Sequence, residues 1–90
     1  MSQAIVNPQE LRRFASNLQA FNHSVQDSGS RLSTEFRSLG DTWRDQEHAR
    51  FAQVFQETTQ ALERFTRASE EHIPFLIRKA EAAEEYLRRR

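Results

Sequence analysis

Histidine and carboxylate side chains are the residues of this chain best suited to chemistry, because they bind metal ions and transfer protons. The three histidines are His23, His48 and His72. No two of them lie three or four residues apart with a further ligand, and no His-Glu-X-X-His pattern occurs. Their spacing therefore does not predict a metal site. His72 precedes the apolar Ile73 and is interpreted as an interface residue.

The carboxylates follow a pattern typical of solvent-exposed helix faces. Glutamates alternate with arginines near the C-terminus, at Glu70, Glu71, Glu81, Glu84 and Glu85. Metal sites in helical bundles need inward-pointing glutamates and a Glu-X-X-His spacing, which the sequence around His48 lacks. The chain also has no cysteine, no glycine-rich phosphate loop and no nucleophile elbow. We predict that the protein is not an enzyme and uses no cofactor or metal.

Charge and hydropathy exclude further classes of function. The 13 basic and 13 acidic residues cancel, so no net charge favours nucleic acid, and neutral polar faces argue against a membrane-active helix. The longest apolar run, residues 73–77, contains Pro74 and is too short to span a bilayer. Residues 1–6 lack the features of a Sec signal peptide. Arginines 88–90 are interpreted as a flexible, solvent-exposed end.

The remaining sequence reads as two long helices. Asn7 as N-cap, Pro8 at the first helical position and Glu10 three residues after the cap predict a helix start. Apolar residues then recur on one stripe up to Leu39, so we expect a helix over residues 8–39. The members of this stripe are Leu11, Phe14, Ala15, Leu18, Phe21, Val25, Leu32, Phe36 and Leu39.

Residues 40–45 break the helical pattern. Gly40 suits a C-cap and either Asp41 or Asp45 an N-cap, and so short a connection makes the helices antiparallel neighbours. The second helix is expected over residues 45–87, with Phe51, Val54, Phe55, Leu62, Phe65, Ile73, Leu76, Ala80, Ala83 and Leu87 on its apolar face. Its outer face offers three pairs of opposite charge at helical spacing, namely Glu63 with Arg67, Glu84 with Arg88 and Glu85 with Arg89.

Two residues interrupt the pattern. Folding the chain about residue 42 places Gly29 opposite Phe55, which predicts a groove for that ring; the alternative is a frayed or kinked helix. Pro74 lies inside the second helix and either kinks or ends it. The same fold-back places Leu11 near Ile73. This leaves Ala80, Ala83 and Leu87 with no partner in the hairpin other than the N-terminal residues Ala4, Ile5 and Val6.

The apolar stripes are too wide for one hairpin to bury. We therefore expect an all-α protein whose single domain, residues 1–90, has an N-terminal tail at 1–7 and dimerises into an elongated four-helix bundle. The expected core contains Leu11, Phe14, Leu18, Phe21, Val25, Leu32, Phe36, Phe51, Phe55, Leu62, Phe65, Ile73 and Leu76.

The turn carries the most informative motif. It reads Leu-Gly-Asp-Thr-Trp-Arg-Asp over residues 39–45 and is followed by Ala49, Phe51 and Phe55. With a helix on each side and Trp43 near mid-chain, the sequence resembles the small Trp-X-Gly proteins of type VII (ESX) secretion. Asp45 stands where that family has glycine, and as an N-cap it offers another way to shape the turn. Trp43 either covers the open end of the bundle or is recognised by a partner.

The resemblance implies a non-catalytic secreted or secretion-associated protein that works as a homodimer or with a paralogous hairpin. It also implies recognition by a type VII secretion ATPase, through the turn (Gly40, Trp43, Asp45) and Tyr86. Exported family members carry Tyr-X-X-X-Asp/Glu, whereas here Arg90 follows Tyr86 at the acidic position. One interpretation is therefore that a type VII system exports the protein without a Sec signal peptide. The alternative is a cytoplasmic helical-bundle adaptor or chaperone.

Overall fold

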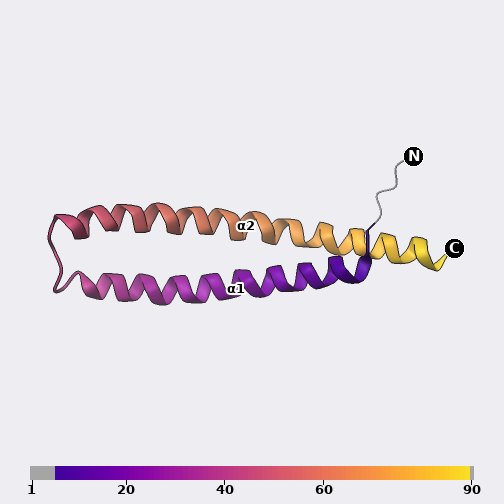
Figure 1. The fold of residues 1–90 in the computed structure, drawn as a ribbon, viewed down its shortest axis with the longest axis horizontal. Coiled ribbons are helices and arrows are strands. Elements are labelled where there is room, and N and C mark those ends of the chain that lie inside the picture. The colour runs from indigo at the N-terminus through magenta and orange to yellow at the C-terminus, as the bar shows by residue number, and fades with distance from the viewer. Residues whose placement is uncertain (1–5, 90) are drawn as a thin grey trace.

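The computed structural model describes residues 6–89 and contains two long helices joined by a short turn. Helix α1 spans Pro8–Leu39 and helix α2 spans Gln46–Arg88. The helices lie side by side in opposite directions and form an elongated hairpin of 67 × 24 × 16 Å (Figure 1). The predicted all-α hairpin is confirmed. No helix within residues 6–89 is long and apolar enough to cross a membrane.

Helix α1 begins and ends as its sequence predicts. The side chain of Asn7 accepts a hydrogen bond of 3.1 Å from the backbone N–H of Glu10, with Pro8 in the first turn. Gly40 caps the C-terminus with φ −63° and donates to the carbonyl of Arg37. This cap therefore uses an ordinary right-handed conformation that does not need glycine's freedom.

Helix α2 starts after Asp45, whose side chain accepts a 3.1 Å hydrogen bond from the backbone N–H of His48. The φ of Asp45 is −88°, so the position that holds glycine in the Trp-X-Gly motif needs no left-handed backbone here. Pro74 lies within α2, which continues to Arg88. The sequence left open whether Pro74 kinks or ends the second helix, and the prediction that it ends the helix is wrong. Arg89 is the C-cap, and Arg90 lies outside the described residues, as do positions 1–5 of the expected tail.

Small side chains form the tightest part of the seam between the helices. Ala15 is 1% exposed and Ala80 is fully buried. The expectation that Ala80 has no partner on the first helix is therefore wrong. The fold-back placed the start of α1 beside Ile73, but Arg12 pairs with Glu84. A symmetric fold about residue 42 would place Arg12 opposite residue 72, so the observed pairing with Glu84 shows that the helices are offset along their length. The end of α2 therefore lies beside the first turns of α1.

The groove predicted at Gly29 does not hold Phe55. A Cβ atom added at Gly29 would meet no heavy atom within 4 Å beyond its own chain neighbours and local helix backbone. Phe55 instead stacks on Phe36, with ring centroids 5.0 Å apart. The reason is again the offset between the helices. Gly29 lines a polar groove with Thr59, Leu62 and Thr66.

Candidate interaction surface

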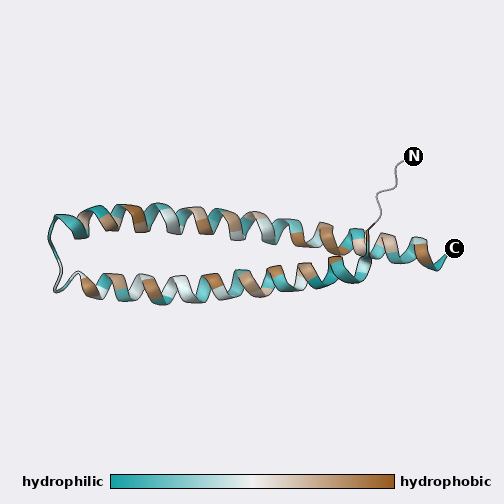
Figure 2. Ribbon diagram, in the orientation of Figure 1, coloured by the Kyte–Doolittle hydropathy of each residue, from teal (hydrophilic) through white to brown (hydrophobic). Residues whose placement is uncertain are grey.

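The two helices leave many large apolar side chains exposed. In Figure 2, apolar and polar segments alternate along both helices. The exposed fractions range from 41% to 68% for Phe14, Phe21, Leu32, Leu39, Phe51, Val54, Leu62, Phe65, Phe75, Tyr86 and Leu87. Exposed apolar area of this extent marks a site of association.

Residues expected in the core divide into two groups. The first group is half-buried along the seam of the hairpin and contains Leu11, Leu18, Val25, Phe36, Phe55, Ile73 and Leu76. The second group is exposed in the single chain and contains Phe14, Phe21, Leu32, Phe51, Leu62 and Phe65. One hairpin thus covers only the first group.

The exposed phenylalanines of both helices share one side of the hairpin. Phe14 and Phe21 each precede a buried seam residue of α1, and Phe65 precedes the buried Thr66 of α2. At 100° per residue, this position places all three rings on the same flank of the seam. Phe21 and Phe65 meet across the helices edge to face, with ring centroids 6.1 Å apart. We call the exposed apolar residues on this flank the apolar face.

The opposite flank is polar. The same helical rotation places Arg12 and Glu84 on the other side of Ala15 and Ala80, and their side chains form an ion pair across the helices. The groove beside Gly29 lies on this flank and is lined by charged as well as small residues, including Arg37, Arg67 and Glu70. The hairpin therefore has one apolar side and one charged side.

The turn is held by a column of aromatic rings. The imidazole of His48 lies parallel to the Phe36 ring at 4.9 Å and meets Trp43 edge to face at 5.0 Å. Phe36 also contacts Phe51 and Phe55. Trp43 is half-buried, and its backbone N–H donates to the carbonyl of Leu39 over 3.0 Å. The tryptophan thus packs against the end of the hairpin and retains an exposed part.

Sequence reasoning missed the role of His48 in this column. The sequence signal that could have indicated this role is the position of His48 three residues after the N-cap Asp45. This position places His48 in the first turn of α2, where it faces the end of α1. The Nε2 atom of His48 is buried and has no hydrogen-bond partner. Within residues 6–89, no group of three histidine or acidic side chains lies close enough to hold a metal ion.

A buried polar cluster in the middle of the seam was also missed. Asn22 is fully buried, and its Nδ2 donates to Ser69 Oγ over 2.7 Å and to Glu70 Oε2 over 2.8 Å. Ser69 Oγ donates in turn to the carbonyl of Thr66 over 3.1 Å. The available signal was a polar residue at the seam position seven residues after Ala15.

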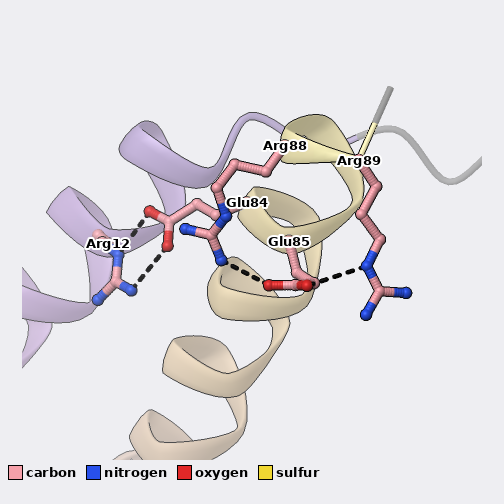
Figure 3. A network of polar contacts seen from close by, with 5 residues as sticks. All are labelled: Arg12, Glu84, Glu85, Arg88 and Arg89. Carbon is pink, nitrogen blue, oxygen red and sulfur yellow. Dashed lines mark hydrogen bonds and ion pairs between the residues drawn. The ribbon is translucent and has the colours of Figure 1, made fainter.

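Polar contacts also organise the open end of the hairpin (Figure 3). Arg12 donates from Nε and Nη2 to the two carboxylate oxygens of Glu84, each over 2.9 Å. The hydrogen bonds from Arg12 lower the pKa of Glu84 despite its partial desolvation, and the same contact raises the pKa of Arg12. The predicted Glu84–Arg88 pair is therefore wrong, because Glu84 is engaged by α1.

The other two predicted pairs differ in outcome. Glu85 does bond Arg89, over 3.0 Å, and also Arg88. No ion pair joins Glu63 and Arg67 in the part of the chain that the structure describes. Tyr86, the predicted recognition residue near the C-terminus, is 68% exposed.

Comparison with known proteins identifies relatives along almost the whole chain. The family model WXG100, described as proteins of 100 residues with WXG, matches residues 3–86. The crystal structure of the secreted protein EsxB from Bacillus anthracis is 26% identical, with a TM-score of 0.71, and the match covers 93% of this chain and 97% of that chain. A structure of an EsxB variant has the same identity and a TM-score of 0.72, with 96% of each chain covered. No curated protein matches the sequence significantly.

Proposed function

The chain belongs to the WXG100 family, and on this basis we propose that it is a small, non-catalytic protein of type VII secretion that acts as a helical-bundle dimer. Export would need no Sec signal peptide. The similar EsxB proteins are described as secreted, which supports the same fate for this chain. The single observation that carries the dimer is the apolar face.

A second hairpin is the occupant that fits the apolar face best. The face follows both helices, from Leu39 of α1 and Phe51 of α2 near the turn, through Phe65, to Phe14 near the open end. A partner of similar length with an apolar face of its own would cover it, and two such hairpins make a four-helix bundle. The charged flank, with Arg12 and Glu84, would remain in solvent.

We favour two identical chains over a pair of paralogues. With 13 basic and 13 acidic residues, a second copy brings no net repulsion. Symmetric association also lets each exposed phenylalanine meet an apolar side chain of the other copy. A paralogous hairpin is the competing partner.

Recognition by secretion machinery is assigned to the two ends of the hairpin. At one end, the partly exposed Trp43 lies in the turn between the helix-capping residues Gly40 and Asp45. At the other end Tyr86 projects into solvent. A type VII ATPase is the proposed partner of these surfaces. Arg90, at the acidic position of the family's export pattern, favours instead the alternative of a protein retained in the cytoplasm as an adaptor or chaperone.

Sedimentation equilibrium tests the dimer directly. The purified chain at micromolar concentration should have twice the mass of one chain, and a mass of one chain would reject the dimer. Export is tested by expressing the protein in cells with an active type VII system, beside cells that lack its ATPase. Protein found outside only in the presence of the ATPase supports export. Protein that stays inside both cell types would reject export and support the alternative of a cytoplasmic adaptor or chaperone.

A further inference from the structure

The ion pair between Arg12 and Glu84 joins two residues 72 positions apart in the sequence. Both guanidinium–carboxylate hydrogen bonds measure 2.9 Å, and the side chains are 41% and 34% exposed. Among the ion pairs within residues 6–89, it alone links α1 to α2, since the others lie within α2. It is therefore the one ion pair of the described residues that fixes the position of one helix relative to the other.

This pair lies where packing between the helices ends. Ala80, one turn before Glu84, is fully buried, whereas Tyr86 is 68% and Leu87 47% exposed. In Figure 1 the end of α2 runs on past the start of α1. We call residues 85–89 the C-terminal arm. Its base lies beside Asn7 and Pro8, which line a shallow pocket with Glu84 and Leu87.

The geometry of the pair restrains direction as well as distance. Two parallel N–H···O bonds between a planar guanidinium and a carboxylate fix how the two groups are oriented. The bonds of Glu85 to Arg88 and Arg89 connect residues three and four apart in one helix. Such local pairs stabilise helical structure but leave the direction of the arm relative to α1 undetermined.

We propose that Arg12 and Glu84 are positioning residues for the C-terminal arm, which they hold beside α1 so that Tyr86 is presented at a fixed place. This role rests on the proposed function, in which Tyr86 is recognised by secretion machinery. Tyr86 follows Glu84 by two residues, and at 100° per residue this turns its side chain about 200° around α2 from that of Glu84. The pair acts from the opposite flank and leaves Tyr86 accessible.

Amide hydrogen exchange of the full-length chain tests this role. Replacement Arg12→Gln or Glu84→Gln should speed exchange at residues 85–89 by roughly two- to five-fold, the range expected for loss of one exposed ion pair. Exchange at residues 46–70 should stay as in the wild type. The charge swap Arg12→Glu with Glu84→Arg should restore slow exchange, because the pair can form in reverse.

Glu85→Gln is the matched control, since it removes two ion pairs of the same arm but leaves the contact with α1. It should also speed exchange at residues 85–89, but its effect should add to that of Arg12→Gln, whereas Glu84→Gln should add nothing once Arg12 is replaced. Unchanged exchange in Arg12→Gln would overturn the proposal, as would acceleration over the whole hairpin or a charge swap that fails to restore protection. These measurements need no secretion machinery. A protein that behaves as expected here but is never exported would reject the proposed function alone.

Discussion

Phe21 of α1 and Phe65 of α2 meet edge to face with ring centroids 6.1 Å apart, yet each ring remains about half exposed. This contact joins the helices at the surface, outside the seam formed by Ala15 and Ala80. It therefore ties the shape of the apolar face to the pairing of the helices. A partner that binds this face contacts both rings together.

Replacement Phe65→Ser should weaken dimerisation. Covering the exposed half of a phenylalanine contributes about 1–2 kcal/mol, so the dissociation constant should rise roughly five- to thirty-fold, as measured by sedimentation or light scattering over a concentration series. Arg67→Ser, two residues away and directed to the charged flank, is the matched control and should leave the constant unchanged. Equal effects of the two substitutions would exclude the apolar face as the interface.

The buried cluster around Asn22 should show strong coupling. Ser69→Ala removes one acceptor from the buried Asn22 amide and should lower the free energy of unfolding by about 1–2 kcal/mol. Asn22→Leu replaces the amide with an apolar group of similar size. Adding Ser69→Ala to that variant should then cost much less than it does in the wild type.

Chemical denaturation of the two single variants and the double variant measures this coupling as a double-mutant cycle. Strictly additive effects would contradict a specific hydrogen bond between Asn22 and Ser69.

Gly29→Ala should stabilise the protein. A Cβ atom at this position meets nothing within 4 Å, and alanine in a helix interior is favoured over glycine by about 0.5–1 kcal/mol. Thermal unfolding followed by circular dichroism should show a higher melting temperature. A lower temperature would indicate that a bulky side chain fills the site after all, as the fold-back about residue 42 had predicted.

The Arg12–Glu84 pair should give stability a specific dependence on pH. The hydrogen bonds from Arg12 lower the pKa of folded Glu84 below its ordinary value of 4.5. Because the pKa of Glu84 is lower in the folded chain, the unfolded chain binds a proton at this carboxylate more readily. The stability that the ion pair contributes is therefore fully present above pH 4.5 and is lost as the pH falls through the folded pKa.

Urea denaturation at several pH values measures this effect. The difference in stability between the wild type and Glu84→Gln should be constant from pH 7 to about pH 5 and should shrink at lower pH. A difference independent of pH down to pH 2 would show that the ionised carboxylate is not the stabilising form.

Local sequence signals determined both helices and the turn. Asn7 is the N-cap that its side chain and the following residues predict, and Asp45 is the N-cap of α2, one of the two candidates, Asp41 and Asp45, that the sequence offered. The spacing of apolar residues predicted α1 over the range seen and α2 to within one residue at each end. These features depend on residues only a few positions apart, which is why the sequence alone defines them. The Trp43 turn likewise carried the family resemblance that the match over residues 3–86 bears out.

The tertiary structure decided which residues of the two helices meet. Glu84 had two arginines available, Arg88 at helical spacing and Arg12 far away in the sequence, and it pairs with Arg12. Gly29 faces a polar groove in place of Phe55. Periodicity gives the direction of each side chain around its own helix, but the offset between two helices depends on packing of small residues such as Ala15 and Ala80. The identical spacing of apolar residues also could not tell the half-buried Phe36 from the exposed Phe21, because the boundary between seam and apolar face exists only once the second helix is in place.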